Sequence, residues 1–153
     1  MLEIIDLADR PDLIPACATW NFGEWGEFCG GTLEQTITDF HNLVQANDGQ
    51  IARIALFDGE LAGTALLIDN DLETHPHLKP WVASVFVLPD YRGKSIAKSL
   101  VDTIEKAAAE LGHNEAYLYT DKPDLYRQIG WVDFEKLDGH YAGMLIMKKK
   151  IAR

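Results

Sequence analysis

The sequence predicts a mixed α/β fold, and three patterns in the middle of the chain carry that prediction. Two β-rich runs, Ile51–Phe57 and residues 61–68, flank an Asp58-Gly59 dipeptide, whose tolerance of positive φ suits a tight hairpin. Residues 81–88 form a nearly continuous apolar run, which is typical of a central strand buried on both faces. In residues 96–111 apolar side chains then recur at spacings of three and four, as on one face of a long helix.

Before the hairpin, the chain is predicted to form one strand and two helices. Residues 1–7 are rich in aliphatic side chains and predict a strand, whereas residues 13–20 and Leu33–Ala46 predict helices. Thr32 is expected to cap the second helix, and Gln35 stands three residues later, where it would complete a capping box.

After the buried strand, the chain is predicted to run through the long helix and four shorter elements. Gly112 is expected to end the long helix at its C′ position. A strand follows at Glu115–Thr120, then a short helix at residues 124–129, and then strands at Val132–Lys136 and residues 141–149. The apolar face of the long helix would comprise Ile96, Leu100, Val101, Ile104, Ala107, Ala108 and Leu111.

Size and composition predict one soluble domain over residues 1–153. That length can bury a core without disulfides or metals, and no repeat or linker divides the chain. No apolar run is long enough to cross a bilayer, and the first residues lack the pattern of a secretory signal, so we expect a cytoplasmic protein without a membrane partner. The net charge of −10 disfavours nucleic acid as a partner and suits cationic ones, although solubility alone also explains it.

We expect no metal site. The two cysteines, Cys17 and Cys29, have neither a CxxC spacing nor a clustered histidine, and both are interpreted as plain thiols. Among the five histidines only His75 and His77 lie close together, and an exposed loop is the simpler account of that pair.

Residues 89–97 join the buried strand to the long helix and are a candidate phosphate site. Backbone N–H groups at a helix start lack intrahelical partners and, with the helix dipole, attract anions. Gly93 leaves room for close approach, and Arg92 and Lys94 add positive charge; the same residues would also make a polar turn without a ligand. Gly93-Lys94-Ser95 is similar to the end of a nucleotide-binding P-loop, but Leu88 stands where that motif needs glycine.

At these residues the chain resembles the GNAT superfamily of acyltransferases. The family signature is Arg or Gln, two residues, Gly, one residue, then Gly or Ala, and here it reads Arg92-Gly93-Lys94-Ser95-Ile96-Ala97, with Ser95 where the family usually has glycine. The segment at residues 125–131 is similar to the family's Leu-Tyr-x-x-x-Gly-Phe segment. The resemblance implies a twisted, mostly antiparallel sheet of about seven strands flanked by helices, with the fourth and fifth strands splayed apart.

The resemblance also implies acetyl-CoA as cosubstrate and a set of residues that would bind it. Backbone groups of Val85, Phe86 and Val87 would hold the pantetheine arm and the acetyl carbonyl, the latter through the Val87 N–H. The turn formed by Arg92, Gly93, Lys94, Ser95, Ile96 and Ala97 would bind the pyrophosphate. Tyr126 matches the family tyrosine near the sulfur and would protonate the leaving thiolate, or alternatively would only pack beneath the CoA arm.

The general base and the acceptor stay open at this point. Carboxylates at Asp69, Asp71, Glu24 and Glu27 could take the proton of the amine, although a solvated surface charge is the simpler account of each. An aromatic-rich segment could line a pocket for a cationic, partly apolar acceptor or could pack in the core; it comprises Trp20, Phe22, Trp25 and Phe28.

The sequence therefore predicts an acetyl-CoA-dependent N-acetyltransferase, in which a primary amine of a small molecule or peptide attacks the thioester directly. The alternative is a CoA-binding or regulatory module of the same fold with little catalysis. A homodimer is compatible with either function.

Overall fold

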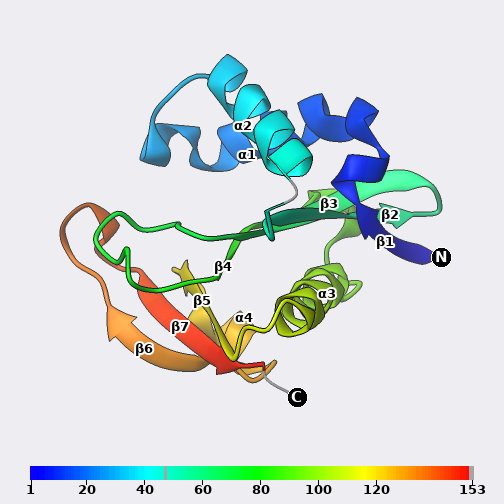
Figure 1. Ribbon diagram of the computed structural model, residues 1–153. Helices are drawn as coiled ribbons and strands as arrows, with labels where there is room; N and C mark the ends of the chain where they lie inside the picture. The colour runs from blue at the N-terminus through cyan, green and yellow to red at the C-terminus, as the bar shows by residue number, and fades with distance from the viewer. Residues whose placement is uncertain (47, 152–153) are drawn as a thin grey trace.

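The computed structural model describes residues 1–46 and 48–151, without the side chains of residues 27–29. A single sheet forms the centre of the molecule, and helices cover both of its faces (Figure 1). The strands are β1 Leu2–Asp6, β2 Ile51–Phe57, β3 Glu60–Ile68, β4 Trp81–Val87, β5 Glu115–Thr120, β6 Val132–Lys136 and β7 Leu145–Lys150. The α-helices are α1 Ile14–Cys29, α2 Leu33–Ala46, α3 Ile96–Glu110 and α4 Pro123–Arg127, and short 3-10 turns lie at Leu7–Asp9, Pro11–Leu13, Pro89–Tyr91 and Gly139–Tyr141.

The seven strands lie in the order β1-β2-β3-β4-β5-β7-β6. Neighbouring strands are antiparallel, except that β4 and β5 are parallel. The β4–β5 pair is also short, since its register consists of Trp81 opposite Tyr117 alone. Beyond Trp81 the two strands part, which confirms the mostly antiparallel sheet with a splayed central pair.

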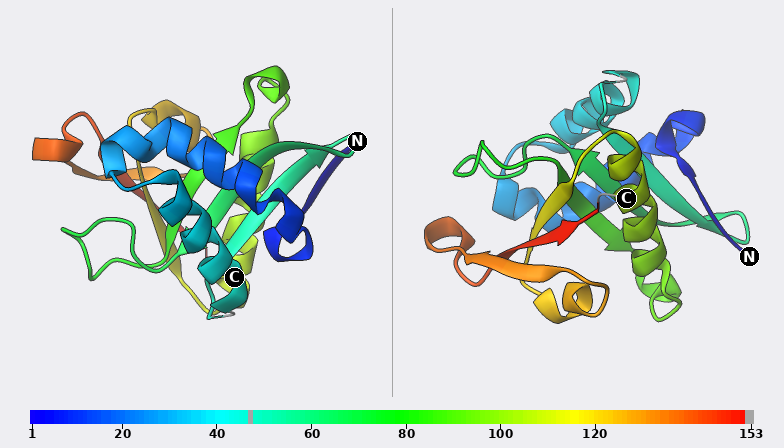
Figure 2. Two further views of the ribbon diagram at one scale, coloured as in Figure 1. Left: turned by 90° about the horizontal axis from the view of Figure 1, so that it is seen from above. Right: turned by 60° about the horizontal axis from the view of Figure 1, so that its bottom comes forward.

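Helices α1 and α2 cover one face of the sheet, and α3 and α4 lie on the other (Figures 1 and 2). The core on the α1 side is formed by side chains that include Ile14, Phe40 and Ile54. The core on the α3 side includes Leu100 and Ile104 of the predicted apolar face. Both faces of the middle strands are therefore buried, as the continuous apolar run of β4 predicts.

Local sequence signals account for most element boundaries. Asp58 and Gly59 have φ of 51° and 83°, so the predicted hairpin turn is confirmed. Gly112, with φ of 95°, follows α3 as expected. The Thr32 hydroxyl accepts a hydrogen bond from the Gln35 N–H at 3.1 Å, but the Gln35 amide donates to Asp39, so the second half of the capping box is wrong.

Helix α1 is longer than predicted, because it continues through two glycines to Cys29. A Cβ at Gly26 would lie only 2.8 Å from the Phe22 ring, so glycine is required there by packing along the helix rather than by a break in it. At the other end of the chain, β7 begins at Leu145 rather than 141, because residues 139–141 turn as a 3-10 helix. Within the described residues, no helix has the length and apolar character needed to cross a membrane.

Candidate active site

Strand β4 contains a bulge immediately before the residues expected to hold the thioester. Leu66 of β3 pairs with Ala83 and Thr64 pairs with Phe86, so Ser84 and Val85 together oppose a single residue of β3. Ser84 has φ of 53°, the left-handed conformation that favours glycine.

The bulge changes which side chains of β4 face which layer. Ala83 packs into the α1-side core, and Ser84 also faces α1, where its hydroxyl accepts a hydrogen bond from the Asn21 side chain. Val85 and Val87 pack against the α3-side core. Ala83 and Ser84 thus face α1 in succession. After them the side chains alternate again between the two faces of the sheet, shifted by one residue.

The backbone of Val87 points away from β3. The Leu88 N–H donates to the Ala62 carbonyl at 2.8 Å, which makes the neighbouring pair of Val87 and Gly63 the non-hydrogen-bonded one. In such a pair the N–H and C=O are directed outward, here to the side where β5 has parted from β4. The Val87 carbonyl accepts a hydrogen bond from Arg92 Nε at 2.9 Å on that side.

The turn at residues 92–97 contains two left-handed residues in close succession. Gly93 has φ of 82° and Ser95 has φ of 62°, and Ser95 is the N-cap residue of α3. A Cβ at Gly93 would meet no atom within 4 Å, so the turn is open above this residue. Ile96 is buried in the α3-side core, and Ala97 packs against it, so these residues anchor the helix while their N–H groups stand at its unpaired start.

Both basic side chains of the turn already have aromatic neighbours. Lys94 Nζ lies 5.3 Å from the centre of the Phe57 ring, and the Arg92 guanidinium lies 5.8 Å from the centre of the Phe86 ring. An anion at this turn would therefore meet the backbone N–H groups at the start of α3 together with these two cations.

Tyr126 comes from α4 on the α3 side of the sheet. Its side chain belongs to the same buried core as Val87 and Leu118 and is 8% exposed. The ring meets Trp131 edge-on, with centroids 6.3 Å apart. Burial raises the pKa of the Tyr126 hydroxyl to about 12, so this group stays protonated at neutral pH.

A buried carboxylate, Glu105, ties α3 to the far part of the sheet. It lies 2.8 Å from Lys149 Nζ of β7 and accepts a hydrogen bond from the Trp131 indole at 3.1 Å. Lys149 also donates to the Ile129 carbonyl at 2.7 Å. The sequence gives no signal for this network, because its members stand on separate elements and form no local motif.

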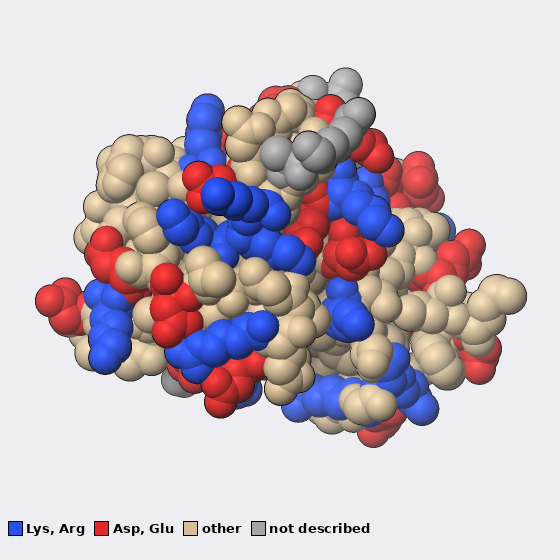
Figure 3. All heavy atoms as spheres, turned by 90° about the horizontal axis from the view of Figure 1, so that it is seen from below, with Lys and Arg blue, Asp and Glu red and all other residues tan. Residues whose placement is uncertain are grey.

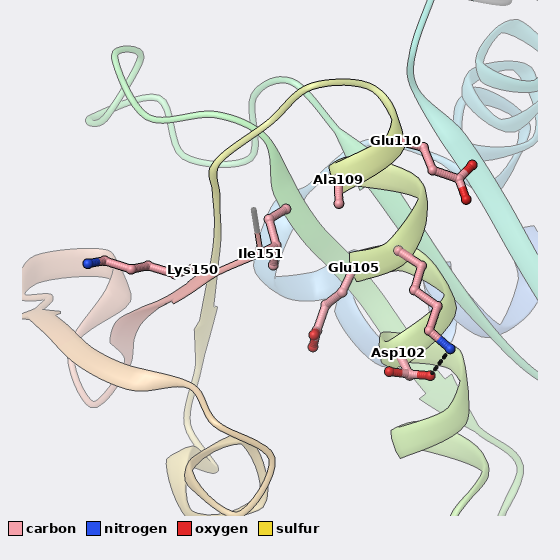
Figure 4. A pocket seen from close by; sticks show the side chains of 7 residues that line it. Asp102, Glu105, Ala109, Glu110, Lys150 and Ile151 are labelled. Atoms are coloured by element: carbon pink, nitrogen blue, oxygen red, sulfur yellow. Dashed lines mark ion pairs between the residues drawn. The ribbon is translucent and has the colours of Figure 1, made fainter. Parts of the chain in front are cut away.

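A hollow of about 710 Å³ lies between α3 and the end of β7 (Figure 4). Glu105 points from α3 toward it, whereas Glu110 points away (Figure 4). Its lining is Asp102, Glu105, Lys106, Ala109, Glu110, Lys150 and Ile151, and none of the residues expected to bind CoA is among them. Lysines and arginines are interspersed with acidic side chains over this side of the molecule (Figure 3).

On the opposite side, α1 lies against β4 through aromatic side chains. The Phe86 ring stands 5.6 Å from Trp20 and 6.4 Å from Trp25, measured between centroids. This aromatic segment thus packs on the strand that carries the expected thioester site. The Phe22 ring instead covers Gly26 within the helix, and the side chain of Phe28 lies outside the described residues.

The four carboxylates considered as bases differ in their surroundings. Burial raises the pKa of Asp71 to about 6. Its neighbour Leu72 packs against Trp81, the residue at which β4 and β5 still pair. Asp69 is half-buried and Glu24 is exposed, whereas the side chain of Glu27 lies outside the described residues.

No three His, Cys, Asp or Glu side chains gather as metal ligands in the part of the chain that the structure describes. His75 and His77 stack with centroids 5.9 Å apart, and His75 Nε2 lies 2.8 Å from a Glu135 carboxylate oxygen. Cys17 is buried, which raises the pKa of its thiol to about 12; the side chain of Cys29 is not among those described.

Solved structures share this arrangement of strands and helices over their whole length. An aminoglycoside 6'-N-acetyltransferase complexed with coenzyme A has a TM-score of 0.76 at 18% identity, over 100% of this chain and 98% of its own. The aminoglycoside 6'-N-acetyltransferase of Enterococcus faecium has a TM-score of 0.71 at 18% identity, over 100% and 98%. The PaiA N-acetyltransferase of Thermoplasma acidophilum, solved with coenzyme A, has a TM-score of 0.68 at 22% identity, over 98% and 99%.

At these identities the structural likeness shows the fold alone, and no curated protein matches the chain at a significant level. The family itself is shown by sequence, because the model of the acetyltransferase (GNAT) family matches residues 14–131, which include β4, the turn at residues 92–97 and Tyr126. The chain therefore belongs to the GNAT family of acetyltransferases.

Proposed function

We propose that this acetyltransferase transfers the acetyl group of acetyl-CoA to a primary amine, using residues 85–97 and Tyr126. The observation that carries the proposal is the backbone of β4 and of the turn that follows it. The bulge directs the Val87 N–H away from β3, and the left-handed Gly93 and Ser95 then present the start of α3. A thioester and a pyrophosphate need donors at these two places.

The cosubstrate would bind on the side where β4 and β5 part. Backbone groups of Val85 and Val87, on either side of Phe86, would hold the pantetheine arm, as an added strand would be held, while the backbone of Phe86 pairs with Thr64 of β3. The N–H groups of residues 93–97 would bind the pyrophosphate, with Arg92 and Lys94 adding charge nearby. The Val87 N–H would donate to the acetyl oxygen, whose negative charge grows as the amine attacks.

In the reaction, the amine nitrogen forms a bond to the acetyl carbon and the carbon–sulfur bond breaks. The nitrogen loses one proton to a base, and the thiolate gains one from an acid. Tyr126 is the proposed acid. An exposed thiol has a pKa of about 8.5, well below that of Tyr126, but burial raises the pKa of the Cys17 thiol in this same protein to about 12. If the CoA sulfur is buried to the same extent, its thiol would have a pKa close to that of the Tyr126 hydroxyl, and the thiolate could accept the proton of Tyr126.

Asp71 is the proposed base. A carboxylate with a pKa of about 6 is deprotonated at neutral pH and is a stronger base than an exposed aspartate. It adjoins Leu72, which packs on Trp81 at the point where β4 and β5 begin to separate. Trp81 stands six residues before Val87 in β4, so the proton would pass from the amine to Asp71 through a chain of water molecules. Asp71 is therefore preferred to Asp69 and Glu24, and the side chain of Glu27 lies outside the described residues.

The acceptor is proposed to be a small or peptidic amine that carries positive charge. Residues 1–79, which form α1, α2 and the first three strands, contain 14 acidic and 3 basic side chains. Residues 80–153 contain 10 acidic and 11 basic ones, so the acidity lies in the part of the chain that does not bind CoA. The structural similarity to aminoglycoside 6'-N-acetyltransferases supports polyamine-like acceptors as the first to test.

We further propose that residues 1–153 act as one cytoplasmic domain, alone or as a homodimer, without metal, membrane or nucleic acid.

The test is acetyl-CoA turnover with a panel of amines, followed as release of free thiol. The panel should include aminoglycosides, linear polyamines, arylalkylamines and peptides with a free α-amine. An enzyme releases thiol in proportion to the acetylated product, which mass spectrometry identifies. A CoA-binding module of the same fold would bind CoA in calorimetry and release no thiol above background with any amine.

A further inference from the structure

Ser84 holds a backbone conformation that its side chain does not favour. A serine at φ of 53° pays the steric cost of a left-handed residue, which glycine would avoid. Bulges of this type commonly place glycine at that position. An interaction from outside the strand is therefore needed to hold the residue where it is.

That interaction comes from α1. The Asn21 side-chain nitrogen donates to the Ser84 hydroxyl at 2.7 Å, and the bond is partly buried. It lies between aromatic contacts that fasten the same helix to the same strand, since Trp20 and Trp25 both stand against Phe86. These aromatic contacts fix the position of the Asn21–Ser84 hydrogen bond, and α1 cannot shift along β4 without breaking that bond.

We propose that Asn21 is a positioning residue, which keeps Ser84 left-handed and thereby keeps the Val87 N–H directed at the acetyl group. If Ser84 relaxed into extended backbone, the bulge would be lost and the strand would move by one residue. Val85 and Val87 would then exchange faces with their neighbours, and the Val87 N–H would turn toward β3. Asn21 itself touches neither CoA nor the reacting atoms in this account.

The inference rests on the proposed function for its kinetic readout, and it makes a specific prediction about residue 84. Ser84→Ala removes the hydrogen bond but keeps a Cβ, so the left-handed conformation stays unfavourable and loses its support. Ser84→Gly removes the hydrogen bond and the steric cost together. The alanine variant should therefore lose kcat by about tenfold, whereas the glycine variant should lose markedly less.

The decisive experiment is a double-mutant cycle with Asn21→Ala. In the Ser84 background, Asn21→Ala should lower kcat about tenfold, with a smaller effect on the KM for the amine. In the Ser84→Gly background the same substitution should change kcat less than about twofold. Thr19→Ala serves as the matched control, because among the described residues this α1 hydroxyl donates only to the Pro15 carbonyl of its own helix.

Two further readouts do not require an acceptor. Calorimetry of CoA binding and hydrogen exchange at the Val85, Phe86 and Val87 amides should change in Asn21→Ala and recover with Ser84→Gly. If the wild-type chain acetylates no amine, the proposed function fails while these readouts still test the positioning role. The inference is overturned if Asn21→Ala leaves kcat, CoA affinity and exchange unchanged, or if its loss persists undiminished beside Gly at position 84.

Discussion

The Glu105 carboxylate of α3 lies 2.8 Å from the Lys149 ammonium of β7. Helix α3 follows β4 in the chain, and β7 pairs with β5, so the contact joins the two parts of the sheet whose strand register is limited to Trp81 opposite Tyr117. It lies on the α3 side, beneath the place where the two strands part. We infer that it helps to set the angle between the strands.

Replacing Glu105 should destabilise the protein and weaken CoA binding together. Glu105→Gln keeps an oxygen for the Trp131 indole but removes the ion pair, and of its two described partners Lys149 then retains the Ile129 carbonyl. Because Lys149 is partly exposed, the loss should fall between the ~1 kcal/mol of a surface pair and the ~3–5 kcal/mol of a buried one. Urea unfolding measures it, and calorimetry measures the affinity for CoA.

The exposed pair of Lys106 and Asp102, 3.1 Å apart on the same helix, provides the control. Lys106→Gln should change the free energy of unfolding by no more than about 0.5 kcal/mol and should leave CoA binding intact. If Glu105→Gln changes the free energy of unfolding and the CoA affinity no more than Lys106→Gln does, the Glu105–Lys149 ion pair does not set the angle between β4 and β5.

Ser95→Gly should raise stability and should maintain or improve the affinity for CoA. Ser95 has φ of 62° at the start of α3, where the family usually has glycine, and relief of a left-handed side chain is worth about 1 kcal/mol. Ser95→Ala keeps the Cβ and should not stabilise. Thermal unfolding of the three proteins separates the backbone effect from any role of the hydroxyl.

Gly93→Glu tests the same turn in the opposite direction. The space above Gly93 is open, although its φ of 82° makes any side chain there strained, and a carboxylate would also meet the pyrophosphate with bulk and like charge. CoA binding should be lost in calorimetry, and most of the fold should remain by circular dichroism. Unchanged CoA affinity in a folded variant would remove the phosphate assignment.

Asp71→Asn should separate a catalytic from a structural role for this carboxylate. The pKa of Asp71 is raised to about 6, above its value of about 3.9 in an unfolded chain, so the folded protein holds its proton more tightly. The contribution of Asp71 to stability is therefore fullest below pH ~4 and is lost as pH rises to about 6.

The asparagine variant should thus be more stable than the wild type at pH 8, with a flatter dependence on pH between ~4 and ~6. If Asp71 is the base, kcat/KM of the wild type should rise with pH through about 6, and the variant should lose that limb. A variant that gains stability and keeps full activity would show Asp71 to be structural only.

Patterns local in sequence predicted most of this fold. A pattern within one short segment predicts each of three features: the Asp58-Gly59 turn, the buried β4 strand and the periodic face of α3. The structure confirms all three. Contacts between distant elements had no such signal. Asn21 and Ser84 stand 63 positions apart, and Glu105 and Trp131 stand 26 apart.

Two features could not be predicted from the residue types. A glycine in a strand is the usual sign of a bulge, but β4 has Ser84 at the left-handed position. Conversely, the helix predicted over residues 13–20 continues as α1 past Gly23 and Gly26 to Cys29, and the Phe22 ring packs over Gly26 within it. The turn at residues 92–97 was predicted because its order of residues is a recognisable motif, whereas no local motif indicated Asn21, Glu105 or Lys149.

Ionic strength should weaken recognition of the acceptor amine. The acidic excess of residues 1–79 would attract a cation, and salt screens that attraction over about 8–10 Å at physiological strength. The KM for the best amine should therefore rise from low to physiological salt while kcat changes little. A neutral acceptor analogue of similar size is the control, and a KM for the cationic amine that is flat with salt would count against electrostatic recognition.

Tyr126→Phe should remove the proposed proton donor and keep the packing of the ring. The side chain is buried in the α3-side core against Trp131, and phenylalanine fills the same space without the hydroxyl, so Tm and CoA affinity should change little. Loss of a general acid lowers kcat by ~10²- to 10⁴-fold, and the drop is smaller where water can supply the proton instead.

Tyr126→Ala is the companion variant, and its cavity should cost about 3–5 kcal/mol whatever the role of the hydroxyl. Measuring kcat under conditions where chemistry limits turnover, with Tm and CoA affinity beside it, distinguishes the two roles. A phenylalanine variant that turns over at the wild-type rate with saturating substrates would leave Tyr126 as a packing residue and assign protonation of the thiolate to water.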